Sequence, residues 1–407
     1  MDNNRLPNFT QRLVKLMKGK DLMINWIKTF IFLALGVFVF VVSLVSGKDK
    51  EFLINKGDVS VVKSDFGLGN SSAFVNAFLD VVSKSKSDIY IMCKAFKFAS
   101  ENLISGSLKQ ANNRNVKLHI ISSSANISYF EPSLTKYYEI DNVTYPGGIV
   151  SNFIIIDTSM VLFFPNYFEE ISENTKNSFF VIINGSEQIA TDAYRYFKLS
   201  QSLLDTSERS KIPPKSRFWP YELLPKTSST KPATLSNKSS AYLSQSQASL
   251  FAPDRDSILS TLTSIINVTK RPPTYVYLSA SDFTTNAKIS FHNVIISSAI
   301  RGSDIKIIIG NTAHLNKTLK SIASVAGIEK ISVRICPPNY NVQDFLLTDS
   351  AFFYQSGPII GPAFINSLGL GLSINNSALN SQIQKQFFEE WSICTDTMSN
   401  YSSIIYQ

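Results

Sequence analysis

The sequence predicts an α/β protein built from two copies of one unit, and two observations lead to this expectation. First, short apolar runs rich in β-branched and aromatic residues alternate with longer segments of helical periodicity, which is typical of sheets covered by helices. Second, four segments of the first half recur in the same order in the second half. With 407 residues, 44% of them hydrophobic, the chain is long enough for a large core and for two domains.

The repeat rests on matched segments with nearly constant spacing. The matched pairs are residues 87–96 with 274–283, 116–124 with 305–313, 151–165 with 343–357, and 178–200 with 369–392. Their starting points are offset by 187, 189, 192 and 191 residues. Four ordered matches at almost one spacing indicate an internal duplication.

The predicted organisation has five parts. They are a basic tail (1–28), a transmembrane signal anchor (29–47), the first half (48–204), a connector (205–247) and the second half (248–407). The connector is rich in Ser, Thr, Pro and Lys, and its Phe218, Trp219 and Tyr221 suggest that it is partly packed against the halves.

The segment 29–47 has no charged residue and is about long enough to cross a bilayer core of roughly 30 Å. A cleaved signal peptide is the competing interpretation, but the apolar run is longer than such a peptide needs, and 28 residues precede it. Six Lys and Arg residues precede the span, so the N-terminus is expected in the cytoplasm. The remaining chain would then lie in the lumen of the endoplasmic reticulum, Golgi or endolysosome, or outside the cell.

Half of the net charge of +8 comes from the tail, so the charge does not select a nucleic-acid partner.

Sequons for N-glycosylation agree with this topology as supporting evidence. On the far side of the span they occur at Asn70, Asn126, Asn142, Asn184, Asn237, Asn267, Asn316, Asn375 and Asn400. Three cysteines are too few for a disulfide scaffold. One pair could form in an oxidising lumen, and Cys336 with Cys394 is the better candidate because both fall in the second half. Alternatively all three are small buried hydrophobic residues, an interpretation favoured for Cys93.

An anchor, two α/β copies and an aspartate that ends an apolar strand in each copy resemble the phospholipase D superfamily, in particular its single-pass, lumen-facing branch. The resemblance covers residues 52–392. It implies two phospholipase D-like α/β halves and one H-x-K-x-x-x-x-D motif in each half. Both motifs are degenerate here. Val150, Asn152 and Asp157 occupy the three motif positions in the first copy, and Val342, Asp344 and Asp349 occupy them in the second.

These replacements remove the chemistry that the resemblance implies. In active members one histidine attacks phosphorus and the other protonates the leaving oxygen, while the lysines stabilise the phosphate oxygens. Valine can do neither task. A negative charge at Asp344, about 4 Å from a phosphate oxygen at an effective dielectric near 20, would cost about 4 kcal/mol. Loss of one member of such a catalytic unit can already cost about a million-fold in rate.

The other candidate groups are few. His119 lies in a predicted strand, His292 in a helical run and His314 in a loop that could approach the cleft. No His/Cys/Asp cluster has metal-ligand spacing, and Gly369–Gly371 falls inside a strand pattern and not in a phosphate loop. The sequence therefore indicates no cofactor and no metal.

Three functions remain open. The leading hypothesis is a catalytically inactive, membrane-anchored protein that acts in binding, scaffolding or regulation, with a protein partner or as a homo-oligomer. The alternative is a phosphodiesterase of phospholipase or nuclease type with altered chemistry, in which Asp157, Asp344 and Asp349 converge as a carboxylate cluster. Binding of nucleic acid or anionic lipid without catalysis is the third, and would show strong salt dependence.

Overall fold

The computed structural model describes parts of the chain between residues 51 and 396. The described residues are 51–53, 59–64, 73–93, 101–122, 139–142, 149, 151–164, 178–204, 233–234, 240–245, 257–267, 272–281, 291–310, 330–338, 340, 342–355, 357 and 368–396. Residues 51–407 form one compact unit. The expected anchor at 29–47 lies outside the described residues, among which no helix is both long enough and apolar enough to span a membrane.

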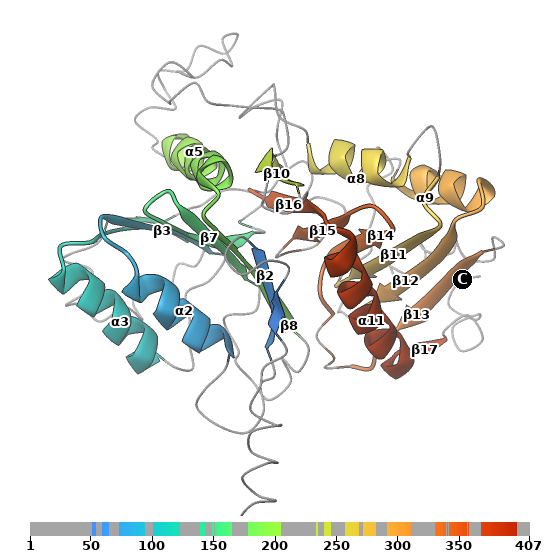
Figure 1. Ribbon diagram of the computed structural model, residues 1–407, viewed down its shortest axis with the longest axis horizontal. Helices are drawn as coiled ribbons and strands as arrows, with labels where there is room; N and C mark the ends of the chain where they lie inside the picture. Colours follow the sequence, from blue (N-terminus) through green and yellow to red (C-terminus); the bar gives the residue numbers. More distant parts are fainter. Residues whose placement is uncertain are drawn as a thin grey trace, which may run out of the picture. The chain divides into compact units, whose positions relative to one another are not determined.

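The first half forms an eight-stranded mixed sheet, and its described residues include the helices α2, α3 and α5 (Figure 1). In chain order its elements are β1 (Glu51–Leu53), β2 (Val59–Ser64), α2 (Ala73–Ser83), β3 (Asp88–Cys93), α3 (Glu101–Asn113), β4 (Lys117–Ser122), β5 (Glu139–Asn142), β6 (Asn152–Ile156), β7 (Met160–Phe164), β8 (Ser178–Asn184) and α5 (Glu187–Leu204). The strand order is β1-β2-β8-β7-β6-β3-β4-β5.

The second half forms a nine-stranded mixed sheet. Its elements are β9 (Ala233–Thr234), β10 (Ser240–Gln245), α8 (Ile258–Ile266), β11 (Tyr275–Ala280), α9 (Phe291–Ile300), β12 (Asp304–Ile309), β13 (Ile331–Ile335), β14 (Phe345–Thr348), β15 (Phe352–Gln355), β16 (Leu370–Asn375), α11 (Ser377–Ile393) and β17 (Thr395–Asp396). The strand order is β17-β13-β12-β11-β14-β15-β16-β10-β9. Strands β9 and β10 lie in the segment that the sequence assigns to the connector, and both pair into this sheet.

The two strand orders confirm that the halves share one topology. The run β2-β8-β7-β6-β3-β4-β5 in the first sheet corresponds strand by strand to β10-β16-β15-β14-β11-β12-β13 in the second. In both halves the central strand pairs in parallel with its neighbour on one side (β3 with β4, β11 with β12) and antiparallel on the other (β3 with β6, β11 with β14). The predicted α/β class and its duplication are therefore present in the structure.

Alternation along the central strands divides the core into three clusters. Ile89 and Ile91 of β3 pack with α2 and α3, whereas Tyr90 and Met92 face the other side of the sheet, together with α5 (Figure 1). In the second half, α8 and α9 cover one face, and residues of α11 pack on the other. The cluster that contains α5 and α11 includes residues of both sheets. Burial on both faces explains why these strands read as nearly continuous apolar runs.

A disulfide fastens the last helix to the second sheet. Cys336, which follows β13, and Cys394, which caps the end of α11, form the pair expected from the sequence. Arg334 adds to this attachment, because its guanidinium donates to the backbone oxygen of Trp391 at 2.7 Å and lies over the Trp391 ring. Cys93 is a buried free thiol.

We expect the double variant Cys336→Ser/Cys394→Ser to be less stable to denaturant than the wild type. The disulfide closes a segment of 58 residues, so the loss should be about 4 kcal/mol by loop entropy. Equilibrium unfolding in urea measures it, with Cys93→Ala as a variant that removes a cysteine without removing the bond. Thiol titration of the unfolded, non-reduced wild type should find one thiol. Three thiols would contradict the pairing.

Candidate functional site

The motif positions of the second half are filled by a core side chain and a buried carboxylate. Val342, at the first position, is 3% exposed and packs in the core cluster shared by both halves. Asp344, at the lysine position, is 7% exposed. Its carboxylate accepts two hydrogen bonds from Ser281, one from the backbone N–H at 3.0 Å and one from the hydroxyl at 2.6 Å. Both motif side chains are thus committed to packing or to hydrogen bonding within the fold.

Ser281 is held in place at the carboxyl end of β11. A Cβ atom on Gly310, the residue after β12, would lie 2.7 Å from the Ser281 backbone oxygen, so only glycine lets the two strand ends approach this closely. On the other side of Asp344, burial and the Asp344 charge raise the pKa of the Tyr354 hydroxyl. The Asp344 carboxylate is therefore held inside the fold at a buried position beside Ser281 and Tyr354.

The first motif lies where the two halves join. Val150 is outside the described residues, but its neighbours Ile149 and Ser151 are buried. Ile149 forms an isolated parallel bridge with Leu368 of the second half. The Ser151 hydroxyl donates to the Leu370 backbone oxygen at 3.0 Å and accepts from the Leu370 N–H at 2.6 Å. Backbone of the second half therefore covers this edge of the first motif.

Asn152 stands at the lysine position of the first motif and begins β6. Its side chain is 1% exposed, and it carries no charge. A neutral amide can donate hydrogen bonds, but it cannot balance the charge of a phosphate group as an ammonium does. Of the two lysine positions, one now holds a neutral group and the other a negative one.

Gly371, the residue after Leu370, serves packing. An added Cβ would lie 2.3 Å from Cζ of Phe353 on the neighbouring strand β15. The glycine-rich stretch at 369–371 thus leads into strand β16, as the sequence suggests. Gly371 permits the close contact between this strand and the Phe353 ring.

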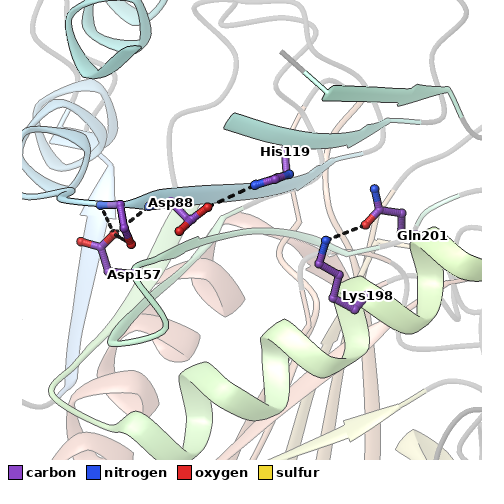
Figure 2. Close-up of polar contacts among 6 residues, drawn as sticks. Asp88, His119, Asp157, Lys198 and Gln201 are labelled. Carbon is purple, nitrogen blue, oxygen red and sulfur yellow. Dashed lines mark hydrogen bonds and ion pairs between the residues drawn. The ribbon is translucent and has the colours of Figure 1, made fainter. Parts of the chain in front are cut away.

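The motif aspartates connect the ends of strands. The Asp157 carboxylate accepts hydrogen bonds from the backbone N–H groups of Lys86, Ser87 and Asp88 at 2.7, 2.8 and 2.9 Å, and from the Ser87 hydroxyl at 2.9 Å. Figure 2 shows Asp157 beside Asp88. Asp349 accepts in the same way from the N–H and hydroxyl of Thr274, at 3.2 and 2.7 Å. In each half the aspartate therefore fixes the turn after β6 or β14 to the segment that leads into the central strand.

The Asp157 turn places two residues in the left-handed region, which Asp157 tolerates and which the β-branched Thr158 adopts at a cost. Asp157 and Thr158 have positive φ angles of 50° and 51°, and the Ser159 N–H donates to the Ile156 oxygen. This is the geometry of a tight hairpin turn in which aspartate is favoured at the first position. Partial burial raises the pKa of Asp157, but the hydrogen bonds from Asp88, Ser87 and Lys86 outweigh it, and the net pKa is lowered.

The carboxylate cluster of the alternative hypothesis is not formed within the second half. Asp344 precedes β14 and Asp349 follows it, so the two lie at opposite ends of that strand, about 16 Å apart at 3.3 Å per residue. Asp157 binds the segment before β3 in the first half. Among the described residues, no group of three or more His, Cys, Asp or Glu side chains could hold a metal ion.

His119 is placed by packing. It lies on β4, 8% exposed, stacked on Tyr90 with ring centroids 4.6 Å apart, and its Nε2 is 3.3 Å from an Asp88 carboxylate oxygen (Figure 2). Tyr90 pairs with His119 on one side and with Ile155 of β6 on the other. His119 is therefore two strands from β6 and level with Ile155, away from Asn152. His292 lies on α9, its side chain outside the described part, and His314 is also outside it.

The position of His119 is matched in the other half, which explains its role. Lys306 stands at the equivalent place on β12, with its Nζ 5.6 Å from the Tyr277 ring centroid. Tyr277 in turn stacks on Phe387 of α11 at 4.8 Å, as Tyr90 contacts Phe197 of α5 at 5.3 Å. In both halves a tyrosine of the central strand is thus held between the next strand and the closing helix.

Two residues of the site, Ser151 and Ser281, carry no signal in the sequence. Each bonds to a residue far along the chain, 219 residues away for Ser151 and 63 for Ser281. A serine beside an apolar strand is common, so only its partner reveals its role. Locally, the sequence shows only that each is a small polar residue directly beside a strand, Ser151 before β6 and Ser281 after β11.

Comparisons with known proteins place the fold. No protein-family model matches the chain, and no curated protein matches it in sequence. The crystal structure of phosphatidylserine synthase from Haemophilus influenzae Rd KW20 is similar, with a TM-score of 0.57 and 12% identity, over 85% of this chain and 88% of that one. Polyphosphate kinase from Porphyromonas gingivalis matches over 78% of this chain and 45% of its own, with a TM-score of 0.49 and 11% identity.

A smaller structural neighbour is Nuc from Salmonella typhimurium, described as a phospholipase D family member. It matches over 39% of this chain and 97% of its own, at 18% identity and a TM-score of 0.32. The fold assignment rests on the synthase alone. The chain thus has the two-sheet α/β fold of that solved synthase, and its neighbours include a phospholipase D family member.

We expect Ser151→Ala to destabilise the joint between the halves. The variant leaves the buried N–H and C=O of Leu370 without the hydroxyl, which should cost about 1–3 kcal/mol. Thermal or urea unfolding measures the loss. Ser83→Ala is the matched control, because the exposed Ser83 hydroxyl bonds only within its own helix. Equal stability of the two variants would contradict the role assigned to Ser151.

We expect Asp157→Asn to lower stability by about 1–2 kcal/mol near neutral pH, after allowance for solvent screening. Because folding lowers the pKa of Asp157, its stabilisation is complete above the ordinary value of 3.8 and disappears as the pH falls through the lowered one. The difference between wild type and variant should therefore shrink in acid. Asp80→Asn, which changes an exposed carboxylate paired with Lys84, should change stability little. A difference that grows below pH 3.8 would refute this account.

Proposed function

We propose that the chain is a phospholipase D-like protein that has lost phosphodiester hydrolysis and acts by binding, as a scaffold or a regulatory partner. In this proposal it is held by one membrane span at residues 29–47, with residues 48–407 on the lumenal or extracellular side. The observation that carries the proposal is the second motif. A core valine stands at the histidine position, and a buried carboxylate bound to Ser281 stands at the lysine position.

The electrostatics at Asp344 oppose an anionic substrate. A repulsion of about 4 kcal/mol at contact distance corresponds to roughly a thousandfold loss of affinity. A lysine at this position would have contributed attraction instead. A phosphate group placed beside Asp344 would also have to compete with its carboxylate for the N–H and hydroxyl of Ser281, both of which already donate to Asp344.

The packing at Val342 opposes the covalent step. Phosphoryl transfer in the manner that the resemblance implies needs an imidazole that can reach phosphorus. Val342 offers no nucleophilic atom, and it contributes its methyl groups to the core cluster that holds the halves together. His119, the one histidine whose side chain the structure describes, is stacked in the first sheet and level with Ile155.

The membrane and lumenal part of the proposal has one structural support. Cys336 and Cys394 are joined by a disulfide, and such bonds persist in oxidising compartments. A span at 29–47 with a basic tail before it would deliver the domain to that side of the membrane.

We expect the full-length protein in detergent to turn over none of three substrates, namely bis(p-nitrophenyl) phosphate, single-stranded DNA and phosphatidylcholine vesicles. The reason is the combined loss of nucleophile, general acid and positive charge. Product release is followed over hours against a blank and against the Asp344→Asn variant, whose fold is checked by thermal melting. Turnover that stays with the protein through successive chromatographic steps would overturn the proposal and favour a phosphodiesterase with altered chemistry.

A further inference from the structure

Two of the nine sequons occupy equivalent places in the two halves. Asn184 ends β8 and precedes α5, and Asn375 ends β16 and precedes α11. β8 and β16 correspond in the two strand orders. The local sequences are Asn-Gly-Ser at 184–186 and Asn-Asn-Ser at 375–377. The duplication has therefore kept an acceptor asparagine and its hydroxyl residue at the same junction of strand and helix.

Both asparagines are exposed although the strands that carry them are mostly buried. In β16 the residues from Leu370 to Ile374 are buried and only Asn375 is exposed. In β8, Ile183 is 1% exposed, whereas Asn184 and the following Gly185 are exposed. The positive φ of Gly185, 78°, turns the chain sharply after Asn184. The side-chain amides thus stand at the rim of each sheet.

The pairing of strands fixes which rim this is. Asn184 lies opposite Met160, the first residue of β7, whereas Asn152 lies opposite Phe164, the last residue of β7. In the second half Ile374 lies opposite Phe352, and Phe345 lies opposite Tyr354. In each half the sequon is therefore at the end of the sheet opposite the motif position.

We propose that Asn184 and Asn375 carry N-linked oligosaccharides. In this step the side-chain amide nitrogen displaces lipid-linked pyrophosphate from the anomeric carbon of the oligosaccharide donor. One C–N bond forms, the C–O bond to pyrophosphate breaks, the amide loses a proton, and the lipid pyrophosphate leaves. The step requires the lumenal topology of the proposed function, which the disulfide supports independently.

Glycans at these two sites would cover one end of the sheet in each half and leave the other end uncovered by them. The ends of the sheets with Asn184 and Asn375 would be covered by sugar, which is bulky and solvated. The opposite ends, with Asn152 and Asp344, would not be covered by these two glycans. A protein partner would then approach from the motif end of the sheets.

The experiment expresses the full chain in a eukaryotic secretory cell. Glycopeptides are mapped by mass spectrometry after removal of glycans by peptide N-glycosidase in heavy-oxygen water. Each acceptor that carried a glycan is then an aspartate with an added heavy oxygen. We expect this label at Asn184 and at Asn375, and loss of one mobility step on gels for each of Asn184→Gln and Asn375→Gln.

Three variants at the hydroxyl residues of the sequons separate glycosylation from folding. Ser377→Ala removes the second sequon without changing Asn375 and should lose one glycan, whereas Ser377→Thr should keep it. Ser186 also accepts a hydrogen bond from the Ile189 N–H at the start of α5, so Ser186→Thr is used there, and it should keep the glycan.

An unmodified asparagine at both positions in the wild-type chain would overturn this inference. If other sequons were labelled, only the choice of sites would fail. If none of the nine were labelled, the lumenal topology would fail with it. Asn267, also exposed, at the end of α8, has no counterpart in the first half, and it tests whether exposure without duplication suffices. Neither result depends on the hydrolysis assay.

Discussion

The buried carboxylate of Asp344 and its two hydrogen bonds from Ser281 are the interaction on which this account depends. A charge in the interior is tolerated only where hydrogen bonds or an opposite charge compensate it. Ser281 supplies that compensation from the end of β11, and Gly310 lets the neighbouring strand end come close to Ser281. A buried, hydrogen-bonded carboxylate therefore stands at the position where the resemblance to phospholipase D places a lysine. Val342 lies beside it in the core shared by both halves, and the proposal of lost hydrolysis rests on these two residues.

The two halves share residues that stabilise the fold, and they differ from the catalytic motif that the resemblance implies. Both halves keep an aspartate that ties a hairpin turn to the start of the central strand, through four hydrogen bonds at Asp157 and two at Asp349. Both also keep a central tyrosine packed on the closing helix, Tyr90 on α5 and Tyr277 on α11. The lysine positions hold different residues in the two halves, Asn152 and Asp344, and each histidine position holds a valine. Features that stabilise each half are present in both copies, whereas the histidines and lysines that the resemblance implies are absent at the motif positions of both.

Much of the fold could be predicted from the sequence, because its strands are buried on both faces and read as apolar runs at a constant repeat spacing. The disulfide partner followed from proximity in the chain. Other features could not be predicted, because they depend on contacts between distant segments. Strands β9 and β10 lie in a stretch whose composition indicates a connector, yet pairing with β16 brings β10 into the sheet. Ser151 and Ser281 look ordinary in sequence and gain their roles from Leu370 and Asp344. The carboxylate cluster is not formed within the second half, since the four residues of β14 separate Asp344 from Asp349.

The claim that this fold offers no phosphate pocket is tested most directly by titrating the full-length protein with orthovanadate and with inorganic phosphate, and following the heat of binding. We expect no saturable binding by the wild type, and none by Asp344→Asn, because removing the charge restores neither lysine nor histidine. Saturable binding of one anion per chain by the wild type, weakened at high salt, would show that a working anion site exists and would contradict the account.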